Sequence, residues 1–246
     1  MASVAEVLDF VEHHTDLDVL AITEHDDFAA AEEARERHAR GRYSFDLVTG
    51  MEVTTLEGHL LALFIQEPVP SFRSLARTIE LVHAQGGLCV VPHPMSPLTR
   101  SIGENGLHRV HRRSDGVYLD GLELDSRAPT WRAIKNRVHR LNRELWGLAE
   151  VGGSDAHFLA CVGCAYTLFP GATAGDLREA ILARTTRAGM GIYPTLGEIG
   201  YGTILRQQWR GLWATPRKVG GRAARRLAGR LSPLLRRPRR DTEPAA

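Results

Sequence analysis

The spacing of apolar residues changes repeatedly along residues 1–200. In some stretches apolar side chains recur every three or four positions, as Val4, Val7, Leu8 and Val11 do, and this period is typical of one face of an α-helix. Other stretches are short aliphatic runs, as at 88–91, which are typical of buried strands. The pattern predicts helices over 3–14, 29–40, 71–85, 131–145 and 176–184, and strands over 18–23, 46–54, 59–65, 88–91, 117–124 and 148–151.

Strands alternate with helices through most of this part of the chain, but at 56–58 a tight turn joins two strands directly. Alternation of this kind favours a parallel α/β architecture, either an open sheet or a barrel. The full length of 246 residues suffices for one large hydrophobic core or two small ones.

The composition, 43% hydrophobic and 24% charged, is that of a soluble globular protein. No stretch reaches the roughly 20 consecutive apolar residues that a membrane-spanning helix needs. Three cysteines cannot form a disulfide framework in a chain of this length, so a reducing compartment is expected. We therefore predict a cytoplasmic protein, with peripheral membrane contact left open by the charge pattern described next.

Charge is distributed unevenly and predicts a main unit at 1–200 and a basic tail at 201–246. Residues 201–240 hold twelve Arg or Lys and no Asp or Glu, and residues 241–246 hold two acids. Of the 31 basic and 29 acidic residues of the whole chain, 19 and 27 therefore lie in residues 1–200, which gives this part a net charge of −8. Trp209 and Trp213 interleave with the first of these cations. Three interpretations of the tail stay open: contact with an anionic membrane surface, binding of nucleic-acid phosphates, or a packed helix followed by a disordered segment.

Acidic and histidine side chains gather where predicted strands end. Six of them follow or close a strand: His25, Asp26, Glu52, His93, Asp155 and His157. His59 begins a strand instead, but the preceding turn reverses the chain and returns it to the strand end that carries Glu52. All seven can therefore converge on one end of the sheet, where α/β folds keep their active sites.

Imidazoles mixed with carboxylates are ligands suited to Zn, Mn or Fe. A carboxylate such as Glu52 can bridge two ions, and two such ions can clamp a phosphate and activate a water between them. A single histidine at a strand end is more often a surface residue than a ligand, but seven such residues at one sheet end predict a metal site. Glu123, at the end of another predicted strand, is either a ligand or a partner of one. Arg100 is a candidate for bidentate contact with a substrate phosphate, or a surface arginine.

Four sequence blocks resemble those of the PHP (polymerase and histidinol phosphatase) family. The block Ala-Ile-Thr-Glu-His-Asp at 21–26 resembles its Ile-Thr-Asp-His-Asp motif, and Gly-Met-Glu-Val at 50–53 with Gly-His-Leu-Leu at 58–61 resembles the second. Val-Pro-His-Pro at 91–94 and Gly-Ser-Asp-Ala-His at 153–157 resemble later ones. The order and approximate spacing of the blocks match the family over residues 3 to about 185.

The resemblance implies a distorted (β/α)7 TIM-like barrel that binds up to three metal ions at the ends of its strands. Carried over by position, Glu52, His59 and His93 form one site with Glu52 bridging, Asp155 belongs to the site that shares Glu52, and His25 and His157 belong to a third. The implied chemistry is the hydrolysis of phosphate esters in a small phosphorylated metabolite, a nucleotide or a short oligonucleotide. His157 or Asp26 is expected to protonate the leaving oxygen, and the sequence does not choose between them.

The chain departs from the family at its beginning. Family members open with a strand carrying Asp-x-His-x-His, whereas residues 1–4 here already stand where the first helix begins. We therefore expect a barrel without its first strand, caused either by a start codon assigned too late, which we favour, or by a true truncation. The alternative function is a catalytically weak PHP-like binding module, which its basic tail brings to nucleic acid or membrane.

Overall fold

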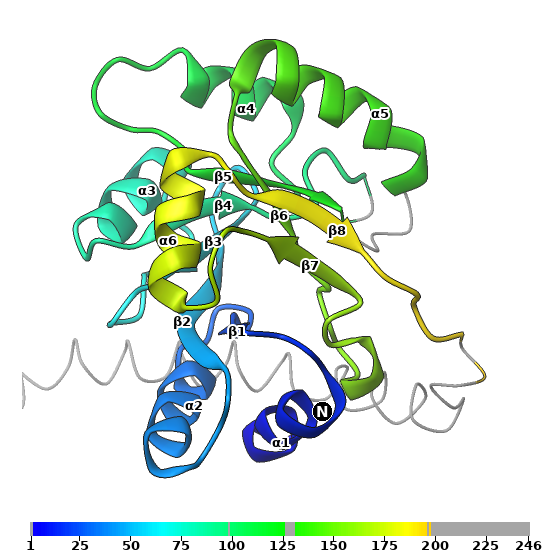
Figure 1. Cartoon of the computed structure of the whole chain (residues 1–246). Helices are drawn as coiled ribbons and strands as arrows, with labels where there is room; N and C mark the ends of the chain where they lie inside the picture. The colour runs from blue at the N-terminus through cyan, green and yellow to red at the C-terminus, as the bar shows by residue number, and fades with distance from the viewer. Residues whose placement is uncertain (1, 98, 126–130, 196, 198–246) are drawn as a thin grey trace, which may run out of the picture. The chain divides into compact units, whose positions relative to one another are not determined.

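The computed structural model describes residues 2–97, 99–125, 131–195 and 197 (Figure 1). Ala2–Pro194 form one compact unit, whereas the predicted basic tail at 201–246 lies outside the described residues. None of the described helices is long and apolar enough to cross a bilayer.

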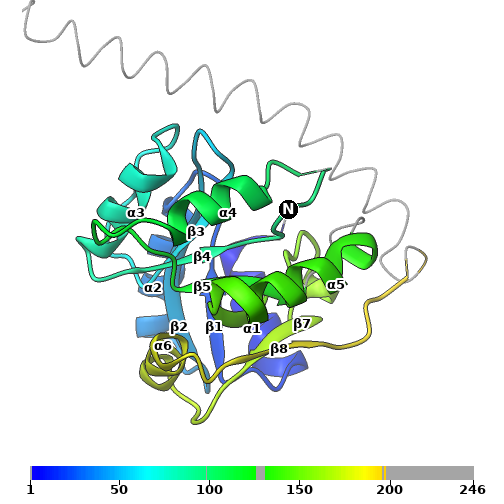
Figure 2. The same ribbon diagram turned by 90° about the horizontal axis from the view of Figure 1, so that it is seen from above.

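A curled six-stranded sheet forms the centre of this unit, and its strands lie side by side in sequence order (Figures 1 and 2). The pairings β1–β2, β4–β5 and β5–β6 are parallel, whereas β2–β3 and β3–β4 are antiparallel. A separate antiparallel pair, β7–β8, lies next to β6. The strands are β1 Val19–Ile22, β2 Asp46–Thr54, β3 His59–Leu63, β4 Leu88–Val91, β5 Gly121–Asp125, β6 Ala149–Gly152, β7 Ala165–Leu168 and β8 Arg187–Met190.

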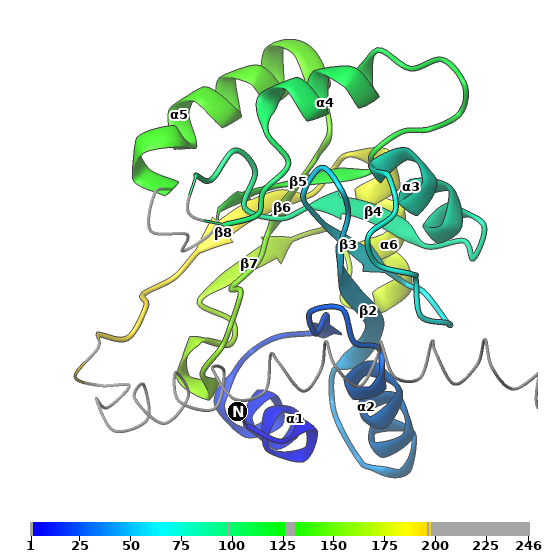
Figure 3. The same ribbon diagram turned by 180° about the vertical axis from the view of Figure 1, so that it is seen from behind.

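Six α-helices in the described part of the chain connect and cover these strands. They are α1 Val4–His14, α2 Ala29–Arg40, α3 Leu75–His83, α4 Glu104–His111, α5 Trp131–Leu141 and α6 Ala174–Ala183, and α5 continues as a π-helical turn over Asn142–Trp146. Ser3 and Thr173 each begin a helix with a reciprocal capping box, to Glu6 and Asp176. Figure 3 shows α1 and α2 near β1 and β2, and α4 and α5 near β5.

The sheet is buried on both faces, as the continuous aliphatic run of β4 predicts. Side chains alternate across a strand, so Cys89 and Val91 join the cluster that contains α3 and α4 residues, while Leu88 and Val90 join the cluster that contains Ile181 of α6. Two layers of apolar contacts therefore fix the strand ends from which the polar side chains described below project.

The architecture confirms the mixed α/β prediction, whereas the closed (β/α)7 barrel stays a prediction because the described strands form a curled half-barrel. Three elements were missed: α4, β7 and β8. Helix α4 has eight residues and buries only Leu107 and Val110, and β8 has four residues and buries none of them fully, so each offers few apolar positions in the sequence. The strand predicted over 117–124 begins only at Gly121.

Asn142 joins the end of α5 to the start of β6, and its loss is expected to destabilise the fold. The side chain is 4% exposed; its Nδ2 donates to the Leu148 carbonyl and its Oδ1 accepts from the Leu148 amide, both at 3.0 Å. Asn142→Ala leaves both backbone groups without these partners, so the free energy of unfolding should fall by about 2 kcal/mol in urea denaturation. Asn105→Ala, at an exposed position of α4, is the control and should change it by less than about 0.5 kcal/mol. Equal changes in the two variants would contradict this role.

Candidate metal centre

The segment after β1 runs alongside the end of β2 and brings His25 next to Glu52. The two residues form an isolated parallel bridge, with the Asp26 amide donating to the Glu52 carbonyl at 2.8 Å and the Glu52 amide donating to the Glu24 carbonyl at 3.2 Å. The backbone therefore holds His25 and Glu52 in register although the strand β1 ends at Ile22.

The β2–β3 hairpin places His59 on the same face as Glu52. Thr54 pairs with His59 across the hairpin, and Glu52 lies two residues before Thr54, so Glu52 and His59 are diagonal neighbours on one face. The turn is closed by the Thr55 hydroxyl, which donates to the Gly58 carbonyl at 2.6 Å. The reversal predicted from the sequence therefore delivers His59 to the strand end that carries Glu52.

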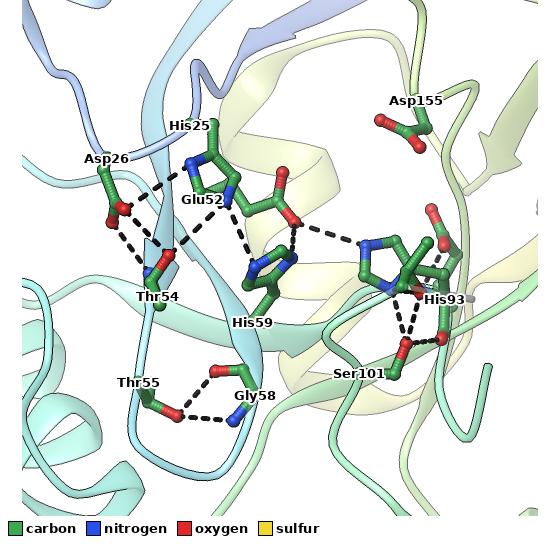
Figure 4. Close-up of polar contacts among 12 residues, drawn as sticks. His25, Asp26, Glu52, Thr54, Thr55, Gly58, His59, His93, Ser101 and Asp155 are labelled. Carbon is green, nitrogen blue, oxygen red and sulfur yellow. Dashed lines mark hydrogen bonds and ion pairs between the residues drawn. The ribbon is translucent and has the colours of Figure 1, made fainter. Parts of the chain in front are cut away.

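Three imidazoles surround one carboxylate at this point (Figure 4). The Nδ1 of His59 lies 2.8 Å and the Nε2 of His93 lies 3.3 Å from the same Glu52 oxygen, Oε1. On the other side of His59, its Nε2 lies 3.1 Å from the Nε2 of His25. His25 therefore lies directly beside His59, although the family resemblance assigns these two residues to different sites.

His93 is held by three kinds of contact that leave its Nε2 facing Glu52. The His93 amide donates to a carboxylate oxygen of Glu123, and the Ser101 hydroxyl donates to the His93 carbonyl at 2.6 Å. The imidazole Nδ1 lies 2.8 Å from the Ser101 hydroxyl and 3.1 Å from that of Thr99. Because Nδ1 is engaged by these hydroxyls, the ring can present only Nε2 to the cluster.

Three residues of this region follow strands in a left-handed backbone conformation. The φ angles are 52° at Asp26, 31° at His93 and 44° at Asp155. Residues other than glycine adopt such angles rarely, and each instance costs on the order of 1–3 kcal/mol. The three residues lie two to four positions beyond the ends of β1, β4 and β6, and their backbone conformation turns the chain there.

The electrostatics of the cluster favour a charged carboxylate. Burial would raise the pKa of Glu52, but the imidazoles of His59 and His93 outweigh it and lower the pKa to about 2. Burial likewise opposes the charged form of His93, but contact with Glu52 and the negative charges of Glu123 and Asp155 raise its pKa. Glu52 is therefore an anion throughout the working pH range of proteins.

The donor set fits a transition-metal ion. His25, Glu52 and His59 each offer one ligand atom, and these atoms all lie within 4.8 Å of one another. The buried Nδ1 of His59 has a close carboxylate neighbour in Glu52 but no hydrogen bond of acceptable geometry. Imidazole nitrogens and a carboxylate oxygen directed at a shared space are the ligands that Zn, Mn and Fe take in proteins.

Asp155 and His157 lie at the edge of the cluster. Asp155 is drawn opposite His25 in Figure 4, and partial burial raises its pKa, although its side chain remains 43% exposed. His157 is 61% exposed, and its Nδ1 lies 2.9 Å from the backbone carbonyl of Asp155. The structure thus brings His25, Glu52, His59 and His93 together directly, with Asp155 close enough to act through its charge and His157 beside it.

Asp26 and Arg100 make contacts with the surrounding backbone. The Asp26 carboxylate accepts hydrogen bonds from the Thr54 amide and hydroxyl and from the Ser71 hydroxyl, and it lies 3.5 Å from the Nδ1 of His25. Burial opposes its charge, but these hydrogen bonds lower the pKa of Asp26. Arg100 donates to the Thr55 carbonyl at 3.3 Å, behind the hairpin turn.

The hydroxyl groups that orient the cluster were missed in the sequence. Two of these hydroxyls, of Thr54 and Ser71, contact Asp26, and two others, of Thr99 and Ser101, contact His93. Serines and threonines are common in loops, and the spacing of these four in the sequence does not distinguish them from the rest. Only their position close to the motif histidines in the folded chain reveals the role.

Comparison with known proteins finds one family model and two relatives that match parts of the chain. Residues 133–186 match a family model described as PHP-associated. Two uncharacterized proteins of Methanocaldococcus jannaschii are each 32% identical to the chain, over 108 and 124 residues, which is 44% and 50% of this chain. These matches cover 57% and 51% of the relatives' own lengths, so the chain spans only about half of each.

Solved structures with the same fold include proteins described as metal-dependent phosphoesterases. A two-domain protein of Bacteroides vulgatus, containing a predicted PHP-like metal-dependent phosphoesterase, has a TM-score of 0.53 at 18% identity, covering 75% of this chain and 60% of that one. A candidate metal-dependent phosphoesterase of Bifidobacterium adolescentis has a TM-score of 0.53 at 19% identity, covering 80% and 93%. PsfC of Pseudomonas syringae has a TM-score of 0.57 at 19% identity, covering 83% and 88%. The PHP-associated match over residues 133–186, the sequence blocks and the shared fold together support the resemblance of the chain to the PHP family.

Proposed function

We propose that the protein is a metal-dependent phosphoesterase that hydrolyses phosphate esters. The observation that carries the proposal is the Glu52 carboxylate held between His59 and His93, with His25 against His59. The substrate class that we propose is a small phosphorylated metabolite, a nucleotide or a short oligonucleotide.

Five residues would hold two or three divalent ions, which we propose to be Zn, Mn or Fe: His25, Glu52, His59, His93 and Asp155. His157, which the family resemblance places in a third metal site, is left free of metal for proton transfer. When bound, such ions neutralise charge on the phosphoryl oxygens and lower the pKa of a water that attacks phosphorus. Glu52 is the best candidate for a bridge, because its carboxylate lies against both His59 and His93 and stays charged.

We assign protonation of the leaving oxygen to His157 rather than to Asp26. The side chain of His157 is exposed at the edge of the cluster and can approach a bound ester. Asp26 is engaged by Thr54 and Ser71, and its lowered pKa makes it a poor proton donor. Its contact with the Nδ1 of His25 instead directs the other ring nitrogen of His25 toward His59.

Arg100 remains a candidate for contact with a substrate phosphate. A guanidinium has five N–H donors, and the bond to the Thr55 carbonyl uses one of them. The position of Arg100, whose carbonyl accepts from the His59 amide, keeps it next to the hairpin that carries the metal ligands.

The test is hydrolysis of a panel of sugar phosphates, nucleoside monophosphates and short oligonucleotides with Mn or Zn added. We expect phosphate release that a chelator abolishes, and a loss of at least about 100-fold in His93→Ala. His13→Ala, at an exposed position of α1, is the matched control and should retain full activity. Metal-loaded protein that hydrolyses no phosphate ester would refute the proposal and favour the binding module instead.

A further inference from the structure

Glu123 is a buried carboxylate in the middle of strand β5. Its side chain is 3% exposed, and the strand pairs in parallel with β4 on one side and β6 on the other. These two neighbours end immediately before the loops that carry His93 and Asp155. Glu123 therefore stands between two of the loops that supply the metal centre.

The contact with His93 is made through the backbone. A Glu123 oxygen, Oε2, accepts a hydrogen bond from the amide of His93, the residue whose φ of 31° is left-handed. A backbone in this conformation persists only where its surroundings hold it. Glu123 binds the amide of His93 and Ser101 binds its carbonyl, so both backbone groups of this residue are fixed by hydrogen bonds. The position of the imidazole depends on the backbone that these two contacts hold.

The contact on the opposite side involves Gly153, directly after β6. A Cβ placed on Gly153 would overlap with the other Glu123 oxygen, Oε1, so an alanine at this position would require the Glu123 carboxylate to move. The pairing of β5 with β6 also shifts register here, since Glu123 pairs with Val151 but Asp125 pairs with Gly152. Such bulges re-aim side chains next to functional sites, and this one lies where β5 turns Glu123 toward both loops.

We propose that Glu123 is a positioning residue, which fixes the His93 loop against the loop that leads to Asp155 and so sets the spacing of the metal ligands. It acts by accepting a hydrogen bond and by filling the space beside Gly153. The proposal rests on the metal centre of the proposed function but not on the reaction catalysed there. It makes Glu123 a partner of a ligand, which resolves the alternative that the sequence left open.

The first test compares Glu123→Gln with Glu123→Ala in Co²⁺ binding, followed by the visible absorption of the bound ion. A glutamine oxygen can still accept from the His93 amide, so Glu123→Gln should keep both the affinity and the spectrum of the wild type. Glu123→Ala should bind Co²⁺ about 10- to 100-fold more weakly, with an altered spectrum. Glu150→Ala, on the neighbouring strand β6, is the control and should resemble the wild type.

Each outcome decides between specific alternatives. A loss in Glu123→Gln as large as in Glu123→Ala would make Glu123 a direct ligand and overturn the positioning role. Unchanged Co²⁺ binding in Glu123→Ala would also overturn it, while leaving the metal centre and the proposed function intact. Absence of Co²⁺ binding by the wild type would refute the metal centre itself.

A second test needs no metal. Hydrogen exchange at residues 93–96 and 99–101 should be faster in Glu123→Ala than in the wild type, and Glu123→Gln should restore protection. A double-mutant cycle tests the contact with Gly153. Gly153→Ala should lower the melting temperature when it is made in the wild type. It should lower the melting temperature much less when it is made in Glu123→Ala, because the Glu123 oxygen that the new Cβ would overlap is absent there. Additive effects of the two substitutions, or unchanged exchange, would contradict the proposed contacts.

Discussion

Replacing Glu52 by glutamine should abolish metal-dependent hydrolysis, with a loss on the order of 1,000-fold in kcat/KM. Glutamine keeps the size of the side chain but removes its negative charge. In the native cluster this charge is fixed, since His59 and His93 lower the pKa of Glu52 to about 2. A neutral amide would face two imidazoles without compensating them, and it would be a poor bridge between two cations.

The measurement combines steady-state kinetics with metal analysis of the purified variant. We expect Glu52→Gln to retain less metal than the wild type at equal metal supply and to fold with a normal circular dichroism spectrum. Glu150→Gln removes an equivalent charge from the neighbouring part of the sheet and should leave both readouts unchanged. Full metal loading of Glu52→Gln would show that Glu52 is not the central ligand.

The largest effect on stability is expected from Gly152→Ala, at the end of β6. A Cβ at this position would overlap with the carbonyl oxygen of Tyr166 and lie 2.9 Å from the Tyr166 carbonyl carbon and 3.1 Å from the Gly189 oxygen. These atoms belong to the backbones of β7 and β8, which are paired with each other and cannot withdraw as a flexible side chain would. We expect the free energy of unfolding to fall by about 3 kcal/mol or more.

Gly175→Ala is the matched control in α6. Its Cβ would meet nothing closer than the Thr173 hydroxyl oxygen at 3.6 Å, and alanine is favoured over glycine in a helix by about 0.5–1 kcal/mol. Chemical denaturation should therefore show one glycine substitution to be strongly destabilising and the other neutral or stabilising. Similar stabilities of the two variants would mean that the β7–β8 pair does not lie against β6 as described.

The candidate site was largely predictable because its residues are tied to strand ends. His25, Glu52 and His93 follow or close short aliphatic runs, and the tight turn at 56–58 marks the reversal that returns His59 to Glu52. The direct approach of His25 to His59 was not predictable, since it depends on the bridge that continues beyond the end of β1.

The rest of the fold was less predictable for physical reasons. Strands β7 and β8 have four residues each, and most of their side chains are partly buried or exposed. The sequence therefore shows no alternation of apolar and polar residues from which these strands could be predicted. Glu123 is an acidic residue that the fold buries completely, and its partner is a backbone amide far away in sequence. Such a contact arises from three strands lying side by side, and the local sequence carries no sign of it.

The sequential strand order has a consequence for how the site is assembled during synthesis. Each strand of the six-stranded sheet pairs with the next one along the chain, so each strand can pair with the one synthesised just before it. The sheet can grow one strand at a time as the polypeptide leaves the ribosome, from the N-terminus onward. His25, Glu52 and His59 are then in place once β3 has paired, before β4 delivers His93 and long before Asp155 is synthesised. A nascent chain exposed as far as Leu63 would thus already contain three of the candidate ligand side chains, and the later strands would add the others.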